Sequence, residues 1–328
     1  ALWEVFMKAK LIVAAACGLL VSGAVQAAEL KVLASGAVKE AYGEIIPQFE
    51  KASGHKVSIT WAGTVDIKKK VAAGEAYDVV IIASNEMDAF VKDGKIAAGT
   101  KVDLVKSAVG VAIKPGTPKP DLSNGDGLKK ALLAAKSVGY STGPSGAYLV
   151  TLFDKMGIAD QVKAKSKITT PGVPVAGLIR SGDAEIGFQQ VSELIHEPGI
   201  EFLGPIPSDV QQITTFSGGI PAGSKETAAA KVLQSFLTAK ERTDTLKKHG
   251  MQVTELPPAE IARLRLELEA WKSRAAAAEC AANLRGVRAA RQHDPCSDRV
   301  VCHPRRGEPS DRGAAGLTGR GSGDRATP

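Results

Sequence analysis

Short apolar segments alternate with amphipathic helical segments along most of this chain, and this alternation is the feature that most limits its fold. Residues 30–34, 56–61 and 77–82 read as strands, because each is short, apolar and bounded by glycine or polar loops. Apolar residues recur at helical spacing over residues 38–51 and 65–73, between those strands. Strands that alternate with helices predict a parallel sheet with helices on both faces.

A second unit of the same kind follows a long apolar stretch at residues 103–114, which we expect to cross into a second lobe. Residues 211–216 are expected to return to the first lobe. Strands and helices alternate between these crossings and continue after them, with helices expected at 128–135, 144–156, 173–180 and 227–246, and strands at 137–140 and 184–188. The sequence thus predicts an α/β fold of two lobes, each a mainly parallel sheet flanked by helices, joined by two crossing strands. Hinged lobes of this kind close around ligands.

The N-terminal segment has the features of a signal peptide. Lys8 and Lys10 give a basic start, and residues 11–21 form an apolar run too short to cross a membrane. Val25-Gln26-Ala27 places small residues where a signal peptidase cleaves. We expect residues 1–27 to be upstream residues and a signal peptide, and the mature protein to be periplasmic.

The C-terminal segment differs in composition from the rest of the chain. Arg180 and Arg242 are the only arginines before residue 252, whereas Lys272 is the only lysine after it. Residues 253–328 are therefore expected to be an Arg-rich tail unrelated to the main fold, partly helical and then disordered. A natural tail, a fusion and a frameshift all remain open as its origin.

The rest of the chain is expected to form the two lobes, with residues 28–108 and 214–252 in the first and 109–213 in the second. It contains no cysteine between residues 28 and 251, so its core needs no disulfide. The net charge of +7 would suit a nucleic-acid partner, but aromatic residues are few and much of the arginine lies in the tail. We expect no nucleic-acid partner and a monomeric protein.

Three loops share one design, in which a strand is followed by glycine and hydroxyl residues and then by the start of a helix. A helix N-terminus offers unpaired N–H groups and a partial positive charge, glycine allows close approach, and hydroxyls add donors. In α/β sheets such loops lie where ligands bind. A single loop would suit mere helix capping, whereas three together predict an anion site. The loops are Ser35-Gly36-Ala37, Gly63-Thr64 and Gly143-Pro144-Ser145-Gly146.

Several sequence blocks, in this order, resemble the periplasmic molybdate-binding protein family of ABC importers. They are Val32-Leu33-Ala34-Ser35-Gly36-Ala37-Val38, Tyr77-Asp78-Val79-Val80-Ile81, Pro144-Ser145-Gly146 and Ala184-Glu185-Ile186-Gly187. The resemblance covers about residues 29–252 and implies a type II periplasmic binding fold that works with a membrane permease and a separate ATPase. Residues 187–194 resemble a divergent branch of the family that includes proteins like aconitate isomerase.

The resemblance also implies ligand contacts at five positions. The family's first serine falls on Ala37, which has no hydroxyl, so that Ser35 is the available substitute. Its second hydroxyl falls on Thr64, and its backbone donors fall on Ser145 and Val173. Its tyrosine donor falls on Gln190. The departures at Ala37 and Gln190 leave the ligand open between a molybdate-like oxyanion and a small carboxylate. The predicted ligand-binding residues are Ser35, Gly36, Ala37, Gly63, Thr64, Ser145, Gly146, Val173 and Gln190.

An isomerase on the same scaffold is the alternative function. Moving a proton along an allylic tricarboxylate needs a base and cationic or amide groups that hold the carboxylates. The sequence assigns no catalytic residue, because none of the available groups forms a known motif. The candidates near the expected cleft are Lys68, Tyr148, Arg180, Gln190 and Glu193.

No metal or cofactor is expected from the sequence. The five histidines show no metal-ligand spacing, and Cys296 and Cys302 do not match a paired zinc site. The chain has no phosphate-loop lysine motif, no Gly-x-Ser-x-Gly elbow and no His-Glu-x-x-His helix. ATP hydrolysis is therefore assigned to a partner.

Overall fold

The computed structural model of the protein describes residues 27–254 together with residues 262–263, 266, 269–270 and 273. The expected signal peptide lies almost wholly outside the described residues, as does most of the expected tail, so both stay predictions. Within the described part, no helix is long and apolar enough to cross a membrane.

The first lobe is built on a sheet in which β1 pairs in parallel with β2 on one side and with β3 on the other. Its strands end at the loops predicted to bind a ligand, because β1 runs into a 3-10 turn and β2 runs into a helix. The elements of this lobe are β1 (Glu29–Ser35), η1 (Gly36–Val38), α2 (Lys39–Ser53), β2 (Lys56–Ala62), α3 (Thr64–Ala72), β3 (Val79–Ala83), α4 (Ser84–Lys92), α10 (Thr227–Leu237), η3 (Lys240–Arg242), α11 (Thr243–Lys248) and β10 (Met251–Val253).

The second lobe is built on a sheet in which β5 pairs in parallel with β6 and with β7. Its remaining elements are the strand β8 and the helices and short turns that cover both faces. The elements of this lobe are α5 (Gly125–Ala134), β5 (Val138–Tyr140), α6 (Pro144–Lys155), α7 (Ala159–Lys163), β6 (Ser166–Ile168), α8 (Ala176–Ser181), β7 (Ile186–Gln190), α9 (Val191–Leu194), β8 (Glu201–Pro205) and η2 (Ser208–Val210).

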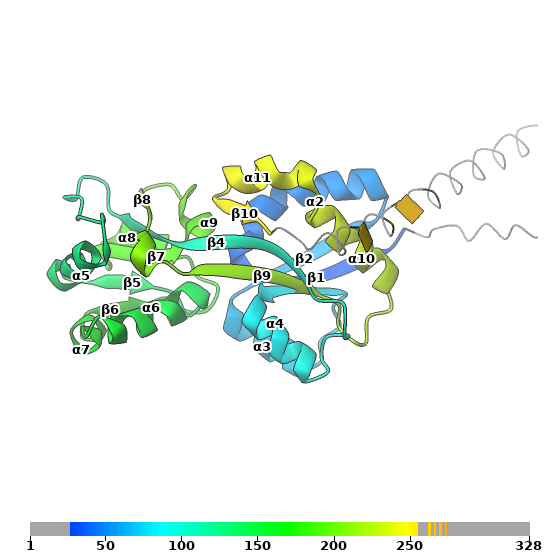
Figure 1. The fold of residues 1–328 in the computed structure, drawn as a ribbon, viewed down its shortest axis with the longest axis horizontal. Coiled ribbons are helices and arrows are strands. Elements are labelled where there is room, and N and C mark those ends of the chain that lie inside the picture. Colours follow the sequence, from blue (N-terminus) through cyan, green and yellow to red (C-terminus); the bar gives the residue numbers. More distant parts are fainter. Residues whose placement is uncertain (1–26, 255–261, 264–265, 267–268, 271–272, 274–328) are drawn as a thin grey trace, which may run out of the picture. The chain divides into compact units, whose positions relative to one another are not determined.

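Two long strands pass between the lobes, as the sequence predicts. They are β4 (Val102–Ile113) and β9 (Ile213–Gly219), which pair antiparallel and run side by side in Figure 1. Residues 105–107 of β4 pair with β10 in the first lobe, and residues 109–113 pair with β7 and β8 in the second. The strand order is therefore β2-β1-β3-β9-β4-β7-β5-β6. Since β4 belongs to both sheets, strand pairing does not place the lobe boundary at one residue. The expected lobe boundaries at residues 108 and 213 therefore stay predictions.

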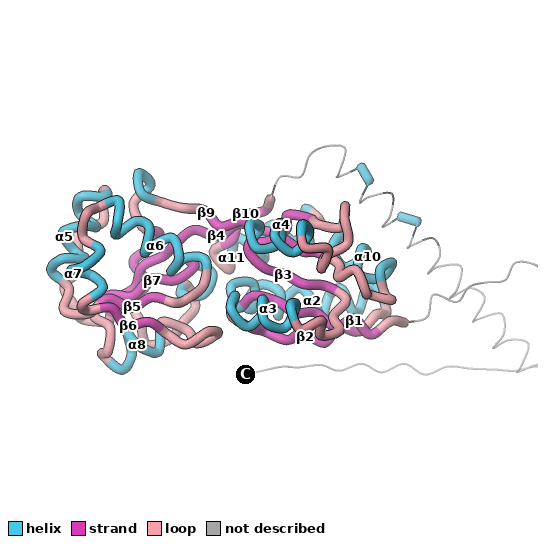
Figure 2. The backbone as a smooth tube through the Cα atoms, turned by 90° about the horizontal axis from the view of Figure 1, so that it is seen from below, coloured by secondary structure: helices cyan, strands magenta, loops and turns pink. Residues whose placement is uncertain are grey.

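Apolar side chains cover both faces of each sheet. In the first lobe, α2, α10 and α11 pack on one face and α3 and α4 on the other, and Figure 1 shows these two layers. Figure 2 shows the first-lobe strands β1, β2 and β3 apart from the second-lobe strands β5, β6 and β7. In the second lobe, α5, α6 and α7 contribute to one cluster, whereas α8 and α9 contribute to another. Helices on both faces of the sheets confirm the predicted two-lobed α/β fold. Among the described strands, only β2-β1-β3 and β6-β5-β7 are parallel, and every pairing of β4 and β9 is antiparallel, so each sheet is mixed rather than mainly parallel.

Two predicted helices were wrong in their limits. The helix expected at 173–180 begins instead at Ala176, because Val173 precedes Pro174 and a residue before proline avoids helical backbone. The helix expected at 227–246 is broken into α10 and α11. The hydroxyl of Thr238 donates to the carbonyl oxygens of Gln234 and Ser235, and the chain leaves helical backbone at the next residue, Ala239.

Candidate functional site

The loop after β1 forms the first part of the site. Ser35 is 5% exposed, and its Oγ accepts a hydrogen bond of 3.3 Å from the N–H of Ala37. This contact caps η1 and fixes the turn, and a hydroxyl that accepts one bond still has its own hydrogen to donate. Gly36 is half-buried and Ala37 is buried. Only the backbone of Ala37 is polar, so Ser35 is the hydroxyl at this loop.

The start of α6 forms the second part. Ser145 is 1% exposed, and its Oγ has no hydrogen-bond partner among the described residues. A Cβ on Gly146 would lie 1.6 Å from the carbonyl oxygen of Ser141, so only glycine lets the helix begin this close to the end of β5. A buried hydroxyl without a partner costs free energy unless a ligand or water satisfies it.

Thr169, which the sequence did not single out, belongs to the same end of the second lobe. It follows β6, and its N–H donates to the carbonyl oxygen of Tyr140. The residue is 5% exposed, and its Oγ1 also lacks a partner among the described residues. Its position directly after a strand was the available signal, but the strand β6 is only three residues long and was not predicted.

The loop after β2 meets the second lobe. Gly63 lies directly before α3, Thr64 is the first residue of that helix, and a Cβ on Gly63 would lie 2.5 Å from the backbone nitrogen of Gly172. Gly63 and Val173 line one cavity of 520 Å³ between the lobes, which Trp61 also lines. The N–H of Val173 donates to the carbonyl oxygen of Thr170, and the side chain is 48% exposed. The two lobes thus touch at glycine backbone.

Gln190 faces the crossing strands. It is fully buried, and its side chain contacts the Oγ1 of Thr214 at 2.9 Å. With the amide turned over, its nitrogen donates to the carbonyl oxygens of Ser107 and Ala108 and its oxygen accepts from Thr214. The amide therefore joins β7 to β4 and β9, and its predicted contact with a ligand stays a prediction.

Gln189 points to the opposite side of the strand, as alternate residues do. Its Oε1 accepts from the N–H of Val175 at 2.8 Å, and its Nε2 donates to Oε1 of Glu193 at 2.8 Å. Both contacts are local to the second lobe. Gln189 therefore fixes the position of the Glu193 carboxyl group relative to the sheet.

Glu193 brings a carboxyl group against the first lobe. Its Oε1 lies 3.6 Å from the position of a Cβ on Gly36, and α9 packs against η1. Burial raises the pKa of Glu193 to about 7, against the lowering effect of its hydrogen bond from Gln189. The group can therefore exist in both protonation states near neutral pH.

The other isomerase candidates have structural partners. Lys68 pairs with Glu86 at 2.8 Å, and Arg180 pairs with Glu197 at the same distance. The hydroxyl of Tyr148 donates to the carbonyl oxygen of Val210 at 2.6 Å. Of the five candidates, Glu193 is the ionisable group that directly contacts a loop predicted to bind ligand.

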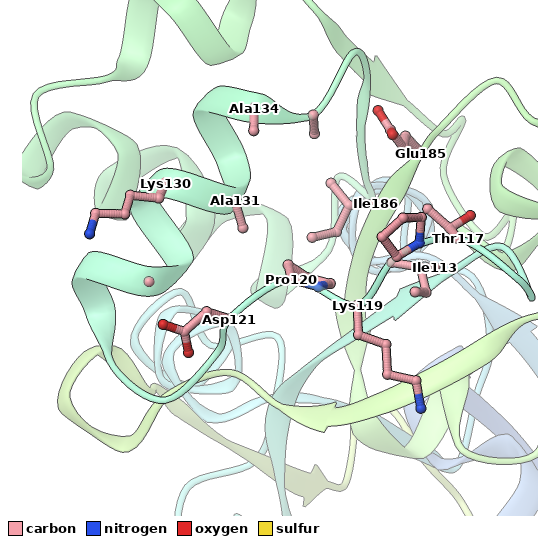
Figure 3. Close-up of a pocket in the computed structure, with 13 residues that line it drawn as sticks. Ile113, Thr117, Lys119, Pro120, Asp121, Lys130, Ala131, Ala134, Glu185 and Ile186 are labelled. Carbon is pink, nitrogen blue, oxygen red and sulfur yellow. The ribbon is translucent and has the colours of Figure 1, made fainter.

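A second cavity of 340 Å³ lies within the second lobe, away from the predicted ligand residues. Figure 3 shows Lys130 and Ala131 of α5 on one side of it and Ile113 and Ile186 of the sheet on the other. It contains none of the nine predicted residues. No group of three or more possible metal ligands occurs in the part of the chain that the structure describes.

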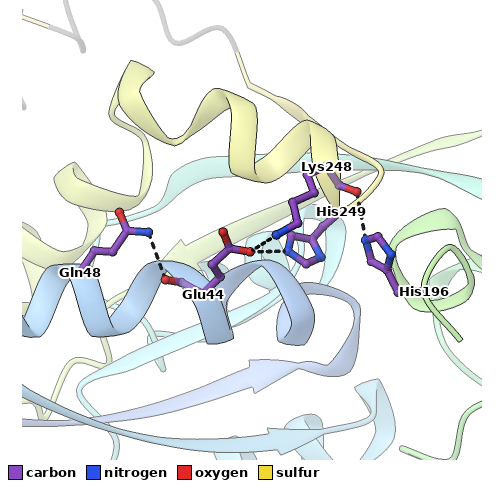
Figure 4. A network of polar contacts seen from close by, with 5 residues as sticks. All are labelled: Glu44, Gln48, His196, Lys248 and His249. Carbon is purple, nitrogen blue, oxygen red and sulfur yellow. Dashed lines mark hydrogen bonds and ion pairs between the residues drawn. The ribbon is translucent and has the colours of Figure 1, made fainter. Parts of the chain in front are cut away.

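A polar network joins the lobes on the side of α2 and α11. The Oε2 of Glu44 lies 2.8 Å from Nζ of Lys248 and 3.0 Å from Nε2 of His249 (Figure 4). His196 belongs to the second lobe, and its Nε2 lies 3.0 Å from the carbonyl oxygen of Lys248. The rings of His196 and His249 meet edge to face, with their centroids 4.9 Å apart.

The structure thus brings two predicted loops into contact with the opposite lobe. Gly63 meets Gly172 and shares a cavity with Val173, and Gly36 meets Glu193. Ser145 and Gly146 lie together at the start of α6 in the second lobe. Two α/β lobes joined by crossing strands, with strand-to-helix loops at their contact, define a periplasmic binding protein of type II.

Comparison with known proteins agrees with this class. The family model of the bacterial extracellular solute-binding proteins matches residues 30–252, and the chain belongs to this family. Aconitate isomerase from Pseudomonas sp is 35% identical over 235 residues, which are 70% of this chain and 89% of that protein. The molybdate-binding protein ModA from Azotobacter vinelandii is 27% identical over 251 residues, or 75% of this chain and 98% of ModA.

A solved structure shows the same fold. The periplasmic molybdate-binding protein of Azotobacter vinelandii superimposes with a TM-score of 0.57 and 18% identity, covering 69% of this chain and all of that one. The predicted resemblance to the molybdate-binding family, including a branch with aconitate isomerase, is confirmed by these relatives.

Proposed function

We propose that this protein binds a small oxyanion or carboxylate between its lobes and delivers it, in the periplasm, to the permease and ATPase of an ABC importer. The lobes close on the anion, and loops from both contribute donors. The proposed contacts are those predicted from the sequence, with Thr169 added.

The observation that carries this proposal is the buried hydroxyl of Ser145. It lies at the N-terminus of α6, a helix of 12 residues, and has no partner among the described residues. A helix N-terminus favours negative charge, and a buried donor without a partner favours a ligand that supplies an acceptor. Thr169 places a second hydroxyl of the same kind in this lobe.

A pair of serine variants tests the proposal. Ser145→Ala should weaken anion binding by about 1–3 kcal/mol, which corresponds to leaving a buried acceptor unpaired. Ser235→Ala is the matched control, because Ser235 is also buried and without a described partner but lies on α10. Isothermal titration calorimetry with molybdate, sulfate and trans-aconitate measures the affinity of both variants. Equal affinities for the two variants would remove Ser145 from the site.

Isomerisation of a tricarboxylate is the second candidate function. The Pseudomonas aconitate isomerase is the relative that favours it, together with the carboxyl group of Glu193 at the lobe contact. In this reaction a base removes a proton from the allylic CH2 group, the double bond moves by one carbon, and a proton returns to the other end. No oxidant or reductant is needed.

Turnover distinguishes the two candidates. The purified protein is incubated with trans-aconitate in D2O and followed by proton NMR. Isomerisation predicts the appearance of the cis isomer and exchange of the allylic hydrogens for deuterium. If titration shows binding but the spectrum stays unchanged after hours at high protein concentration, isomerisation is contradicted. The transport function is then the candidate that stands.

A further inference from the structure

The carboxyl group of Glu193 occupies an unusual place for a protein that binds anions. It lies on α9 in the second lobe and reaches the Ser35-Gly36 loop of the first lobe, within 3.6 Å of a Cβ position on Gly36. Gln189 holds its Oε1 by a hydrogen bond of 2.8 Å. An ionised carboxylate here would repel any anion that the loop binds.

Neighbouring charges do not neutralise this carboxyl group. Within the described residues, no lysine or arginine forms an ion pair with Glu193, and Glu197 acts on it with like charge. His196 lies three residues farther along the chain, and its ring contacts the carbonyl oxygen of Lys248 rather than Glu193. The elements that pack against α9 carry further ionisable groups, none of which pairs with Glu193 in the described structure: Lys39, Glu40, Tyr42, Glu44, Glu50 and Lys51 on α2, Asp103 and Lys106 on β4, and Glu201 on β8.

We propose that Glu193 is a proton-carrying group of the anion site, so that the protein binds its anion together with one proton held on this carboxyl group. The inference rests on the proposed anion-binding function. A neutral carboxyl group removes the repulsion and donates an O–H hydrogen bond to an oxyanion or carboxylate oxygen. Glu193 thereby sets which protonation state of the protein accepts a ligand.

This coupling fixes the direction of the pH dependence. Burial holds the pKa of Glu193 at about 7 in the free protein, and a bound anion would raise it further. Affinity should therefore be constant well below pH 7 and should fall by about tenfold for each pH unit above it, because only the protonated protein binds. A group with this pKa is about one quarter protonated at pH 7.5, so binding there should take up about three quarters of a proton.

Calorimetric titration of the full chain measures this uptake directly. Molybdate, sulfate and trans-aconitate are each titrated at pH 7.5 in two buffers with different enthalpies of ionisation. The difference in observed enthalpy gives the number of protons bound per ligand. The charge of sulfate and of molybdate does not change near this pH, so uptake with either must come from the protein.

Glu193→Gln is the decisive variant, because it keeps the size of the side chain and cannot carry the proton. It should abolish the uptake and make affinity independent of pH between about pH 6 and pH 9. Glu201→Gln is the matched control, because Glu201 lies on β8 outside the site and pairs with Lys119, so its variant should keep the uptake. Melting curves at pH 8 check folding, where removal of a half-buried charge that has no cationic partner should not lower stability.

Each outcome bears on a different claim. Binding with the same uptake in Glu193→Gln would overturn the inference and leave anion binding intact. Binding by the wild type without uptake would overturn it as well. Failure of the wild type to bind any of the three anions would contradict the proposed function itself. If Glu193→Gln does not fold, Glu193→Asp replaces it, and an unmoved pH midpoint in that variant would overturn the inference.

Discussion

Gly63 shows how strongly one residue can determine contact between the lobes. Its backbone meets that of Gly172, and a Cβ there would lie 2.5 Å from the Gly172 nitrogen. Backbone on both sides leaves no flexible side chain that could move aside. The short distance therefore requires glycine at position 63 for this arrangement of the lobes.

Gly63→Ala should therefore prevent full approach of the lobes. Ligand affinity should fall by about tenfold or more, equivalent to at least about 1.4 kcal/mol of closure free energy. The melting temperature of the free protein should change little, because moving the lobes apart at this contact relieves the clash. Gly43→Ala on α2 is the control, since a Cβ there meets nothing within 4 Å. An undiminished affinity in Gly63→Ala would show that this contact is not part of the bound state.

A substitution at Gln190 shows whether its side chain stabilises the fold or contacts the ligand. Its fully buried amide contacts Thr214 and the carbonyl oxygens of Ser107 and Ala108. Gln190→Leu should lower the free energy of unfolding by about 1–3 kcal/mol, because those groups lose their partner. Urea unfolding measures this change. Normal stability with weakened ligand binding would instead support the ligand contact that the family resemblance implies.

At the scale of elements, the pattern located the longer buried strands and most helices, but it missed the short strand β6 and the break between α10 and α11. Buried strands such as β1 and β3 are short apolar runs, so their pattern identifies them directly. The break between α10 and α11 falls at Ala239, whose extended backbone directly follows Thr238, the residue that turns its hydroxyl back onto α10. A threonine within a helical pattern does not predict a break in the helix, since its side chain can also point to solvent.

The positions of the candidate site residues in the fold were predictable to a similar degree, whereas their contacts with a ligand stay predictions. Hydroxyl and glycine residues after strands indicated Ser145 and Gly63 correctly as residues at the ends of the sheets. The opposite directions of Gln189 and Gln190 follow from strand alternation, but which of them faces Glu193 depends on the packing of α9. The contact between Glu193 and Gly36 crosses the lobes, and no local pattern encodes it.

The network around Glu44 predicts a pH dependence at the contact of α2 and α11. Hydrogen bonds from Lys248, and then from His249, lower the pKa of Glu44. A lowered pKa stabilises the fold above the pKa of the unfolded chain, and that contribution is lost as pH falls through the folded value. Glu44→Gln should therefore flatten the fall in melting temperature below about pH 4.

Glu40→Gln provides the control for this experiment. Glu40 is exposed on the same helix and lies outside the network of Figure 4. Melting curves from about pH 2.5 to about pH 6 on both variants cover the range in which an ordinary glutamate titrates. Identical acid profiles for wild type and Glu44→Gln would show that the network does not stabilise the fold.

At the scale of the whole molecule, the crossing strands connect the two lobes and the contacts between them. β4 and β9 join the lobes, Gln190 fastens β7 to both strands, and the network of His196 and Lys248 lies on the same side as α11. Closure around a ligand requires that these connections bend while each sheet stays intact. The lobes are held by separate apolar clusters, so each can move as a body.

The central claim, that a small anion binds between the lobes, is tested most directly by thermal unfolding of the full chain with a panel of anions. The panel is molybdate, tungstate, sulfate, phosphate, citrate, and cis- and trans-aconitate. A ligand at about one hundred times its dissociation constant adds about 2.7 kcal/mol of stability, which raises the melting temperature by about 5–10 °C for a protein of this size. We predict such a shift with at least one anion and its reduction in Ser145→Ala. Unchanged melting temperatures with every anion at millimolar concentration would contradict the claim.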